Sequence, residues 1–236
     1  MKQKLTISKL LIMTILLLSS SLLKAQLITS SADFTPAPGA IYCNGTHVKI
    51  SATADPTAVS YKWYRYPGTD KTTTPVELSA TTLALDDDIT TPGYFTYVAV
   101  GISASLCEST VSDPITVYVL PGITASITAP SLAEYCENAL PTGPAAITLN
   151  AVAGKVGTVS ETFAYNYEWL KDGTPISGAP NSASYTLDDT NDIAPGTHNY
   201  TVKITYKVKA CTATTSAAQA IKVNPKANKP VISITP

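Results

Sequence analysis

A short aromatic segment that occurs twice constrains this chain more than any other feature. Tyr61–Arg65 (YKWYR) returns about 100 residues later as Tyr167–Lys171 (YEWLK), and the two copies hold both tryptophans of the chain. Each copy has a Tyr-Cys pair upstream and one cysteine downstream, which accounts for all four cysteines. The residues are Tyr42, Cys43 and Cys107 around the first copy, and Tyr135, Cys136 and Cys211 around the second. The chain is therefore expected to contain two copies of one folding unit.

Length and composition favour two all-β domains. A chain of 236 residues is long for one domain and comfortable for two. Hydrophobic residues make up 44%, which is enough to form cores and argues against disorder. The many Thr, Val, Ile and Tyr residues, punctuated by 17 Pro and 12 Gly, indicate short strands and turns. With a net charge of -1, the chain has no electrostatic basis for binding nucleic acid or an anionic membrane.

Alternating apolar and polar residues mark the strands. Val48–Ala52 and Ile147–Ala151 alternate at equivalent places in the two units, and Tyr200–Val208 is the clearest half-buried strand. Trp63 and Trp169 are expected to face the cores of their units. Pro-Gly pairs close several of these runs, and strands at this spacing suggest a sandwich.

The N-terminus has the pattern of a secretory signal peptide over residues 1–25. Three lysines precede an apolar run at Leu10–Leu23, and Ala25 offers a small residue for cleavage before Gln26. The alternative is a retained membrane anchor, but the run is shorter than the roughly 20 residues that span a bilayer. No cysteine lies at the cleavage site, so a lipid anchor is not expected. Export places the cysteines in an oxidising compartment, where disulfides form.

The C-terminal residues repeat the beginning of the second unit. Lys229–Pro236 resembles Ile123–Pro130, which is the expected first strand of that unit. Residues 226–236 are therefore interpreted as a linker followed by the first strand of a third unit. Either the chain is a fragment of a longer array, which we favour, or this strand pairs with another molecule.

The order Cys…Trp…Cys resembles that of immunoglobulin-like or PKD-like sandwich modules in bacterial secreted and cell-surface proteins. The resemblance covers nearly all of residues 35–225 and predicts one module at 26–121 and another at 122–225. It implies a non-catalytic extracellular protein whose modules serve adhesion, spacing or the presentation of other domains. The motif is specific for architecture and carries no information about a ligand.

The resemblance also implies one disulfide within each module, Cys43–Cys107 and Cys136–Cys211, because each unit supplies one cysteine of each kind. Four cysteines allow three connectivities. The positions depart from those of antibody domains, where both cysteines sit within strands. Here Cys43 precedes a strand and Cys107 lies beyond one, and such places can fall at opposite ends of a sandwich, too far apart to bridge.

Catalytic equipment is not evident in the sequence. The histidines, His47 and His198, fall in different units without neighbours that suggest a triad or a metal site, and no nucleophile-elbow, zincin or P-loop spacing occurs. The chain is expected to be neither an enzyme nor a cofactor-binding protein.

Two acidic clusters admit a calcium hypothesis, because Ca²⁺ needs several oxygens that converge on one point. The simpler interpretation, which we favour, is that aspartates occupy turns, where they accept hydrogen bonds from nearby amides. The residues are Asp86, Asp87, Asp88, Asp188 and Asp189, with Asp192 next to the second cluster.

An exposed aromatic patch on the first unit is the candidate contact surface. If Trp63 and the alternate valines of the later strand face the core, four aromatic side chains face outward. These are Tyr64, Tyr66, Phe95 and Tyr97. Exposed aromatics serve carbohydrate and protein binding. The alternative is that they stabilise the sheet as cross-strand pairs, or that module packing covers them.

Three functions follow from the sequence. The first is a secreted or cell-surface protein with a structural or adhesive role that contacts protein or matrix. The second is a carbohydrate-binding accessory module. The third is the N-terminal, non-catalytic region of a larger secreted enzyme. The partner is expected to be a protein or glycan at the cell surface.

Overall fold

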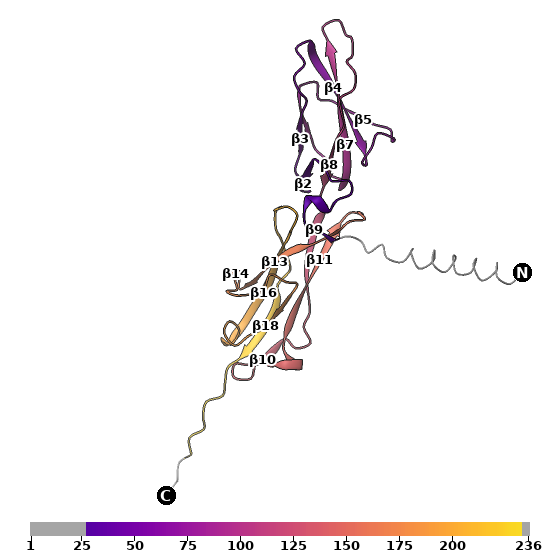
Figure 1. Ribbon diagram of the computed structural model, residues 1–236. Helices are drawn as coiled ribbons and strands as arrows, with labels where there is room; N and C mark the ends of the chain where they lie inside the picture. The colour runs from indigo at the N-terminus through magenta and orange to yellow at the C-terminus, as the bar shows by residue number, and fades with distance from the viewer. Residues whose placement is uncertain (1–26, 233–236) are drawn as a thin grey trace, which may run out of the picture.

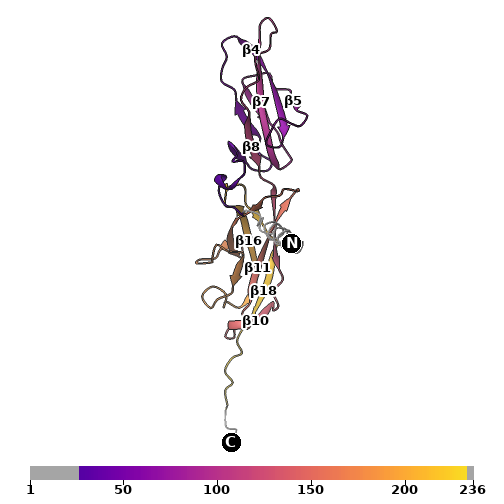
Figure 2. The ribbon, with the colours of Figure 1, turned by 45° about the vertical axis from the view of Figure 1, so that its right-hand side comes forward.

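The computed structural model describes residues 27–232, which form two β-sandwich modules joined end to end (Figures 1 and 2). The signal peptide expected at residues 1–25 lies outside the described residues. The strands and two short 3-10 helices account for all regular structure in the described part. The all-β class and the two tandem sandwiches are confirmed.

Module 1 contains a five-stranded sheet that faces a two-stranded one. The larger sheet has the order β2-β8-β7-β4-β5 and the smaller one pairs β3 with β6. The strands are β2 (Ala40–Tyr42), β3 (Val48–Ser51), β4 (Ala58–Pro67), β5 (Val76–Leu78), β6 (Ala84–Asp87), β7 (Gly93–Ser103) and β8 (Ile115–Val119).

Module 2 repeats this arrangement with two additional strands, β9 and β17. Its larger sheet has the order β10-β18-β16-β13-β14, with β17 also paired to β16, and its smaller sheet has the order β15-β11-β9. The strands are β9 (Gly122–Thr128), β10 (Glu134–Cys136), β11 (Thr148–Val156), β13 (Tyr165–Lys171), β14 (Thr174–Pro175), β15 (Ser184–Thr186), β16 (Gly196–Tyr206), β17 (Thr214–Thr215) and β18 (Gln219–Asn224); the helix η2 is Gly143–Ala145.

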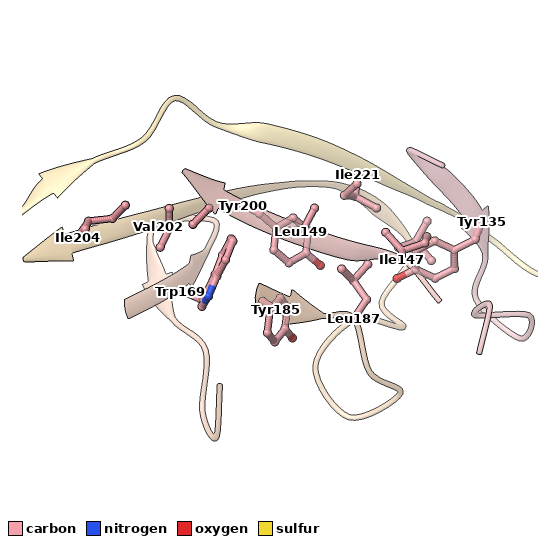
Figure 3. Packing of buried hydrophobic residues seen from close by; sticks show 12 residues of the cluster. Tyr135, Ile147, Leu149, Trp169, Tyr185, Leu187, Tyr200, Val202, Ile204 and Ile221 are labelled. Atoms are coloured by element: carbon pink, nitrogen blue, oxygen red, sulfur yellow. The ribbon is translucent and has the colours of Figure 1, made fainter. Parts of the chain in front are cut away.

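A buried tryptophan marks the centre of each core. The indole N–H of Trp63 donates to the carbonyl of Thr82, and that of Trp169 donates to the carbonyl of Ser182, so both indoles are held in the same way. The module 2 core, drawn in Figure 3, is lined by apolar side chains from both sheets. Its labelled members are Tyr135, Ile147, Leu149, Trp169, Tyr185, Leu187, Tyr200, Val202, Ile204 and Ile221.

A buried carboxylate lies beside each tryptophan strand. In module 1, Asp87 accepts hydrogen bonds from the guanidinium of Arg65 at 2.8 and 2.9 Å and from the Tyr97 hydroxyl at 2.8 Å. Arg65 stands directly opposite Tyr97 in the pairing of β4 with β7. A carboxylate buried without donors costs several kcal/mol, so this contact ties β6 to the larger sheet.

Module 2 builds the same group from different positions. Asp192 is fully buried and accepts from the hydroxyls of Tyr185 and Tyr200, each at 2.6 Å, while the ammonium of Lys171 lies 3.6 Å away. Lys171 stands opposite Tyr200, as Arg65 stands opposite Tyr97. Burial, followed by the bond to Asp192, raises the pKa of Tyr200, so its hydroxyl remains a donor.

The N-terminal segment departs from the expected course. Residues 26–39 were expected to belong to module 1, whose predicted bounds are 26–121. Instead β1 (Leu27–Ile28) pairs with β12 (Thr162–Phe163) of module 2, followed by the helix η1 (Ser31–Asp33). The carboxylate of Asp33 accepts from the amides of Thr29 and Ser30, which closes this turn, and the Thr29 hydroxyl bond lowers the pKa of Asp33 to about 2.

The C-terminal segment follows the last strand without joining either sheet. Residues 225–232 form no strand, and Val231 and Ile232 are 92% and 94% exposed. The segment that they resemble, β9, pairs antiparallel with β11. The linker and first strand of a third unit were expected over residues 226–236, of which residues 233–236 lie outside the described part.

The buried carboxylate of module 2 gives a direct test of this packing. Tyr200→Phe removes one donor from Asp192, and we expect the free energy of unfolding to fall by about 1–3 kcal/mol. The matched control, Tyr64→Phe, removes a hydroxyl that makes no hydrogen bond within residues 27–232 and should change it by less than about 0.5 kcal/mol. Chemical denaturation followed by tryptophan fluorescence measures both. Equal losses in the two variants would contradict the role of Asp192.

Candidate functional site

The disulfide joins the two modules. Cys43 of module 1 is bonded to Cys211 of module 2, with Cα atoms 5.7 Å apart. Cys107 and Cys136 are unpaired and exposed. The expected pairings Cys43–Cys107 and Cys136–Cys211 are therefore both wrong.

The strand directions explain why a module cannot pair its own cysteines. Cys43 follows β2, which runs parallel to β8. It therefore lies at the C-terminal end of β8, from which the chain continues into module 2. Cys107 follows the end of β7, which runs antiparallel to β8, so it lies at the opposite pole of the sandwich. In module 2, Cys136 ends β10 beside Asn224, whereas Cys211 follows β16 at the junction. Each module thus carries its two cysteines at opposite poles.

An aromatic cluster fills the junction between the modules. It combines module 1, the N-terminal segment and module 2 around six buried side chains, namely Ile28, Phe34, Tyr118, Leu120, Phe163 and Tyr206. The ring centroids of Phe34 and Tyr118 are 4.7 Å apart, and those of Phe163 and Tyr206 are 5.1 Å apart in an edge-to-face arrangement. Burial of such rings stabilises the joint beyond the covalent bond.

Polar contacts fix the orientation of the joint. The Tyr118 hydroxyl donates to the Glu161 carboxylate at 2.9 Å, and burial followed by this bond raises the pKa of Tyr118. Across the joint from module 2, the ammonium of Lys209 donates to the carbonyl of Ile41 at 2.6 Å and lies 5.8 Å from the centroid of the Tyr42 ring. These directional contacts distinguish one relative orientation from others.

Sequence reasoning missed this junction because its side chains occupy unexpected faces. Tyr118 lies on the face of β8 opposite to Val117 and Val119, where a half-buried strand normally meets solvent. Phe34 comes from the segment before β2, which contains no regular alternation of apolar and polar residues. The signal that was available is a single aromatic residue, Tyr118, at an outward-facing position three residues before the Pro121–Gly122 boundary.

The expected aromatic patch is largely buried. Phe95 is 8% exposed and Tyr97 is 0% exposed, so their assignment to the outer face is wrong. In the antiparallel pair of β4 and β7, Trp63 stands opposite Ala99, and residues that stand opposite one another share a face. Phe95, Tyr97 and Ala99 therefore face the core with Trp63, where all three join the module 1 cluster.

Tyr64 and Tyr66 are half-buried and lie on the other face of the same strand. They stand opposite Val98 and Thr96, which are buried although they point away from the core. The hydroxyl of Thr96 donates to the carbonyl of Gly68, so the turn after β4 folds over this face. The candidate contact surface is reduced from four aromatic residues to two.

The acidic clusters are occupied by protein donors. Asp86 contacts His47 and Lys49, and Asp188 accepts from the backbone amides of Thr190 and Asn191, as an aspartate in a turn does. Asp87 and Asp192 are the buried carboxylates described above. Asp88 and Asp189 are exposed. Within residues 27–232, no group of three or more His, Cys, Asp or Glu side chains is placed to bind a metal ion.

The two histidines make structural contacts. The ring of His47 contacts the carboxylate of Asp86, and the ring of His198 lies 2.7 Å from the Asp172 carboxylate and 2.9 Å from the Ala194 carbonyl. In the described part of the chain, neither ring is hydrogen-bonded to a serine, threonine or cysteine. Over the same residues, the structure contains no helix of the length and apolarity needed to cross a bilayer.

The chain matches no protein-family model and no curated protein. Solved structures with a similar arrangement include the fibronectin(III)-like modules of Clostridium thermocellum CbhA, at 19% identity and a TM-score of 0.35, covering 84% of this chain and 97% of that one. The amphioxus IgVJ-C2 molecule is similar at 11% identity and a TM-score of 0.37, covering 78% and 99%. The three N-terminal domains of the bacteriophage RB49 Hoc protein are similar at 14% identity and a TM-score of 0.35, covering 78% and 56%. The immunoglobulin-like assignment rests on the strand order of the two modules.

The junction predicts unequal effects for the two pairs of cysteines. Removing the bond with Cys43→Ser and Cys211→Ser frees a loop of 168 residues, which in the chain-entropy model costs about 5 kcal/mol. The matched variant, Cys107→Ser with Cys136→Ser, should change stability by less than about 0.5 kcal/mol. Calorimetric melting without reductant measures the stability of both variants. Equally large losses of stability would contradict the Cys43–Cys211 bond and support pairing within each module.

Proposed function

We propose that this chain is an exported, non-catalytic protein whose two immunoglobulin-like modules form a rigid spacer at the cell surface. The observation that carries the proposal is the junction, where a disulfide and a buried aromatic cluster hold one module on the end of the other. Linked domains otherwise move relative to each other by default, unless their interface is large and apolar. A joint with both covalent and apolar contacts favours a role in which length and direction matter.

The arrangement of the residues supports a structural role. The buried ionisable groups that stand out, Asp87 and Asp192, are each surrounded by donors from their own module, so they act in packing. The histidines are engaged with aspartates and a carbonyl. The disulfide and the signal-like sequence at residues 1–25 support export to an oxidising compartment.

The spacer proposal is tested by small-angle X-ray scattering of the full exported chain. The oxidised variant Cys107→Ser with Cys136→Ser keeps only the Cys43–Cys211 pair and, at concentrations where it is a monomer, should scatter as one extended particle with a single arrangement of its modules. Adding Cys43→Ser, Cys211→Ser and Phe163→Ala to this background should give a broader distribution of maximum dimensions, because it removes the bond and the central ring of the junction. Broad, multi-conformer scattering from the Cys107→Ser with Cys136→Ser variant would overturn the proposal.

The second candidate is a contact surface for glycan or protein on the outer face of β4. Tyr64 and Tyr66 favour it, because they are half-exposed on a face where module 2 carries Leu170 and Asp172 at the equivalent positions. Aromatic side chains contribute much contact area with few rotamers to fix.

A glycan and matrix-protein array tests this second function. We expect the wild type to bind a glycan or protein on the array. The double variant Tyr64→Ala with Tyr66→Ala should bind it with at least about tenfold lower affinity, a loss of about 1.4 kcal/mol. Substitution of the exposed Thr72 to Ala provides the control. Equal signals from the wild type and the tyrosine variant would exclude this face as the contact surface.

A further inference from the structure

Within residues 27–232, module 1 has no counterpart of β9, the edge strand of module 2. In module 2, β11 is paired with β15 on one side and with β9 on the other. In module 1, the equivalent strand β3 is paired with β6, and no other strand of the described part lies along its second edge. The N-terminal segment that would take the position of β9 is instead placed in the junction, where Ile28 and Phe34 are buried.

The open edge changes the course of β3 itself. Ala52 and Ala151 are equivalent, since their amides donate to the matching carbonyls of Leu83 and Ala183. β11 continues beyond Ala151 to Val156 wherever β9 accompanies it, but β3 ends at Ser51 and residues 52–55 are irregular. The strand therefore ends at the point where its missing neighbour would begin to pair.

A groove of about 380 Å³ occupies the position of the missing strand. Ile50 and Ala52 line one side, Ser109 and Ser112 line the other, and Trp63 lies among the lining residues. In module 2 the same place is filled by β9, whose alternate residues Ile123, Ala125 and Ile127 pack against the core. The groove thus suits an extended segment with apolar residues at every second position.

The C-terminal segment has this pattern. Ile232-Ser233-Ile234-Thr235 matches Ala125-Ser126-Ile127-Thr128 of β9, with the isoleucines in the places of Ala125 and Ile127. Ile232 is almost fully exposed in the chain on its own. The segment leaves module 2 from the pole that carries Cys136, whereas the groove lies towards the pole that carries Cys107, at the other end of the molecule. A segment that leaves one pole can therefore fill a groove near the other pole only in a second copy.

The unpaired cysteines fit the same geometry. Cys43 and Cys136 are equivalent, each following a tyrosine in a strand parallel to the last strand of its module, and Cys107 and Cys211 both follow the long central strand. At the junction, the first kind of cysteine is bonded to the second kind in the following module. Cys136 is thus a cysteine of the first kind without a following module, and Cys107 is one of the second kind without a preceding module.

We propose that copies of this chain join head to tail. The segment Lys229–Pro236 of one copy adds to the open edge of β3 in a second copy, antiparallel as β9 is to β11. A disulfide between Cys136 of the first copy and Cys107 of the second closes the joint. This bond forms by thiol–disulfide exchange with an exported oxidoreductase disulfide; the two thiols lose two electrons and two protons, and the oxidoreductase is reduced to its dithiol.

The contact between two copies therefore consists of the added strand and the disulfide, without an aromatic cluster. The aromatic cluster of the junction is not repeated at the poles, since Lys222 stands in module 2 where Tyr118 stands in module 1. The strand addition needs no oxidant, whereas the bond rests on the proposed export. Reduced protein is therefore expected to associate reversibly and oxidised protein permanently.

Complementary cysteine variants test the proposal with full chains. Cys107→Ser keeps only the Cys136 thiol unpaired, and Cys136→Ser keeps only the Cys107 thiol. Mixed in a glutathione redox buffer, they should form a covalent mixed dimer at least about tenfold faster than either forms a self-dimer, which corresponds to about 1.4 kcal/mol of specific contact. Non-reducing electrophoresis with one variant mass-tagged measures the three products. Mixed and self-dimers formed at equal rates would overturn the proposal.

The strand is tested separately by its two faces. Ile232→Asp with Ile234→Asp places charge in the groove and should reduce mixed-dimer formation about tenfold, while the control Val231→Asp with Ser233→Asp changes the opposite face and should have little effect. Equal effects of the two pairs would exclude the segment as the occupant of the groove. The scattering experiment reports on the junction within one chain, whereas the mixed-dimer experiment reports on the contact between chains. A flexible junction together with normal mixed-dimer formation would therefore reject the spacer function and leave the head-to-tail proposal standing.

Discussion

The bond between Cys43 and Cys211 is the constraint on which the architecture depends, because it makes two small sandwiches into one body. It holds the exit pole of module 1 against the entry pole of module 2. The rings of Phe34, Tyr118, Phe163 and Tyr206 then lose their contact with water in a joint that cannot separate. The N-terminal segment completes this joint by pairing with β12, and module 1 is left with an open edge as a consequence.

The interiors of the modules follow the same logic with different residues. Each places a tryptophan at the centre, a cation two positions later in the same strand, a tyrosine opposite that cation, and a carboxylate between them. Module 1 takes the carboxylate from β6 as Asp87, whereas module 2 takes it from the loop after β15 as Asp192. The common requirement is that a buried charge must have donors, and the position along the chain is free to vary.

The repeated YKWYR and YEWLK segments, the alternation in β16 and the Pro-Gly turns were sufficient to predict two all-β sandwiches, because they depend on local periodicity. Contacts between modules could not be predicted in this way. Pairing of Cys43 with Cys107 was inferred by analogy with one module, and the polarity of β2 against β7 excludes it. The outward assignment of Phe95 and Tyr97 failed by one residue of register, since a shift by one exchanges the two faces of a strand.

Tryptic mapping of the oxidised chain tests the central claim most directly. Between Lys71 and Lys155 the sequence contains no lysine or arginine, so Cys107 and Cys136 fall on one peptide, while Cys43 and Cys211 fall on two others that end at Lys49 and Lys222. The structure predicts that these two peptides are linked to each other within one chain and that the 72–155 peptide is not attached to either. Pairing within each module would instead join all three peptides into one species, and that result would contradict the account.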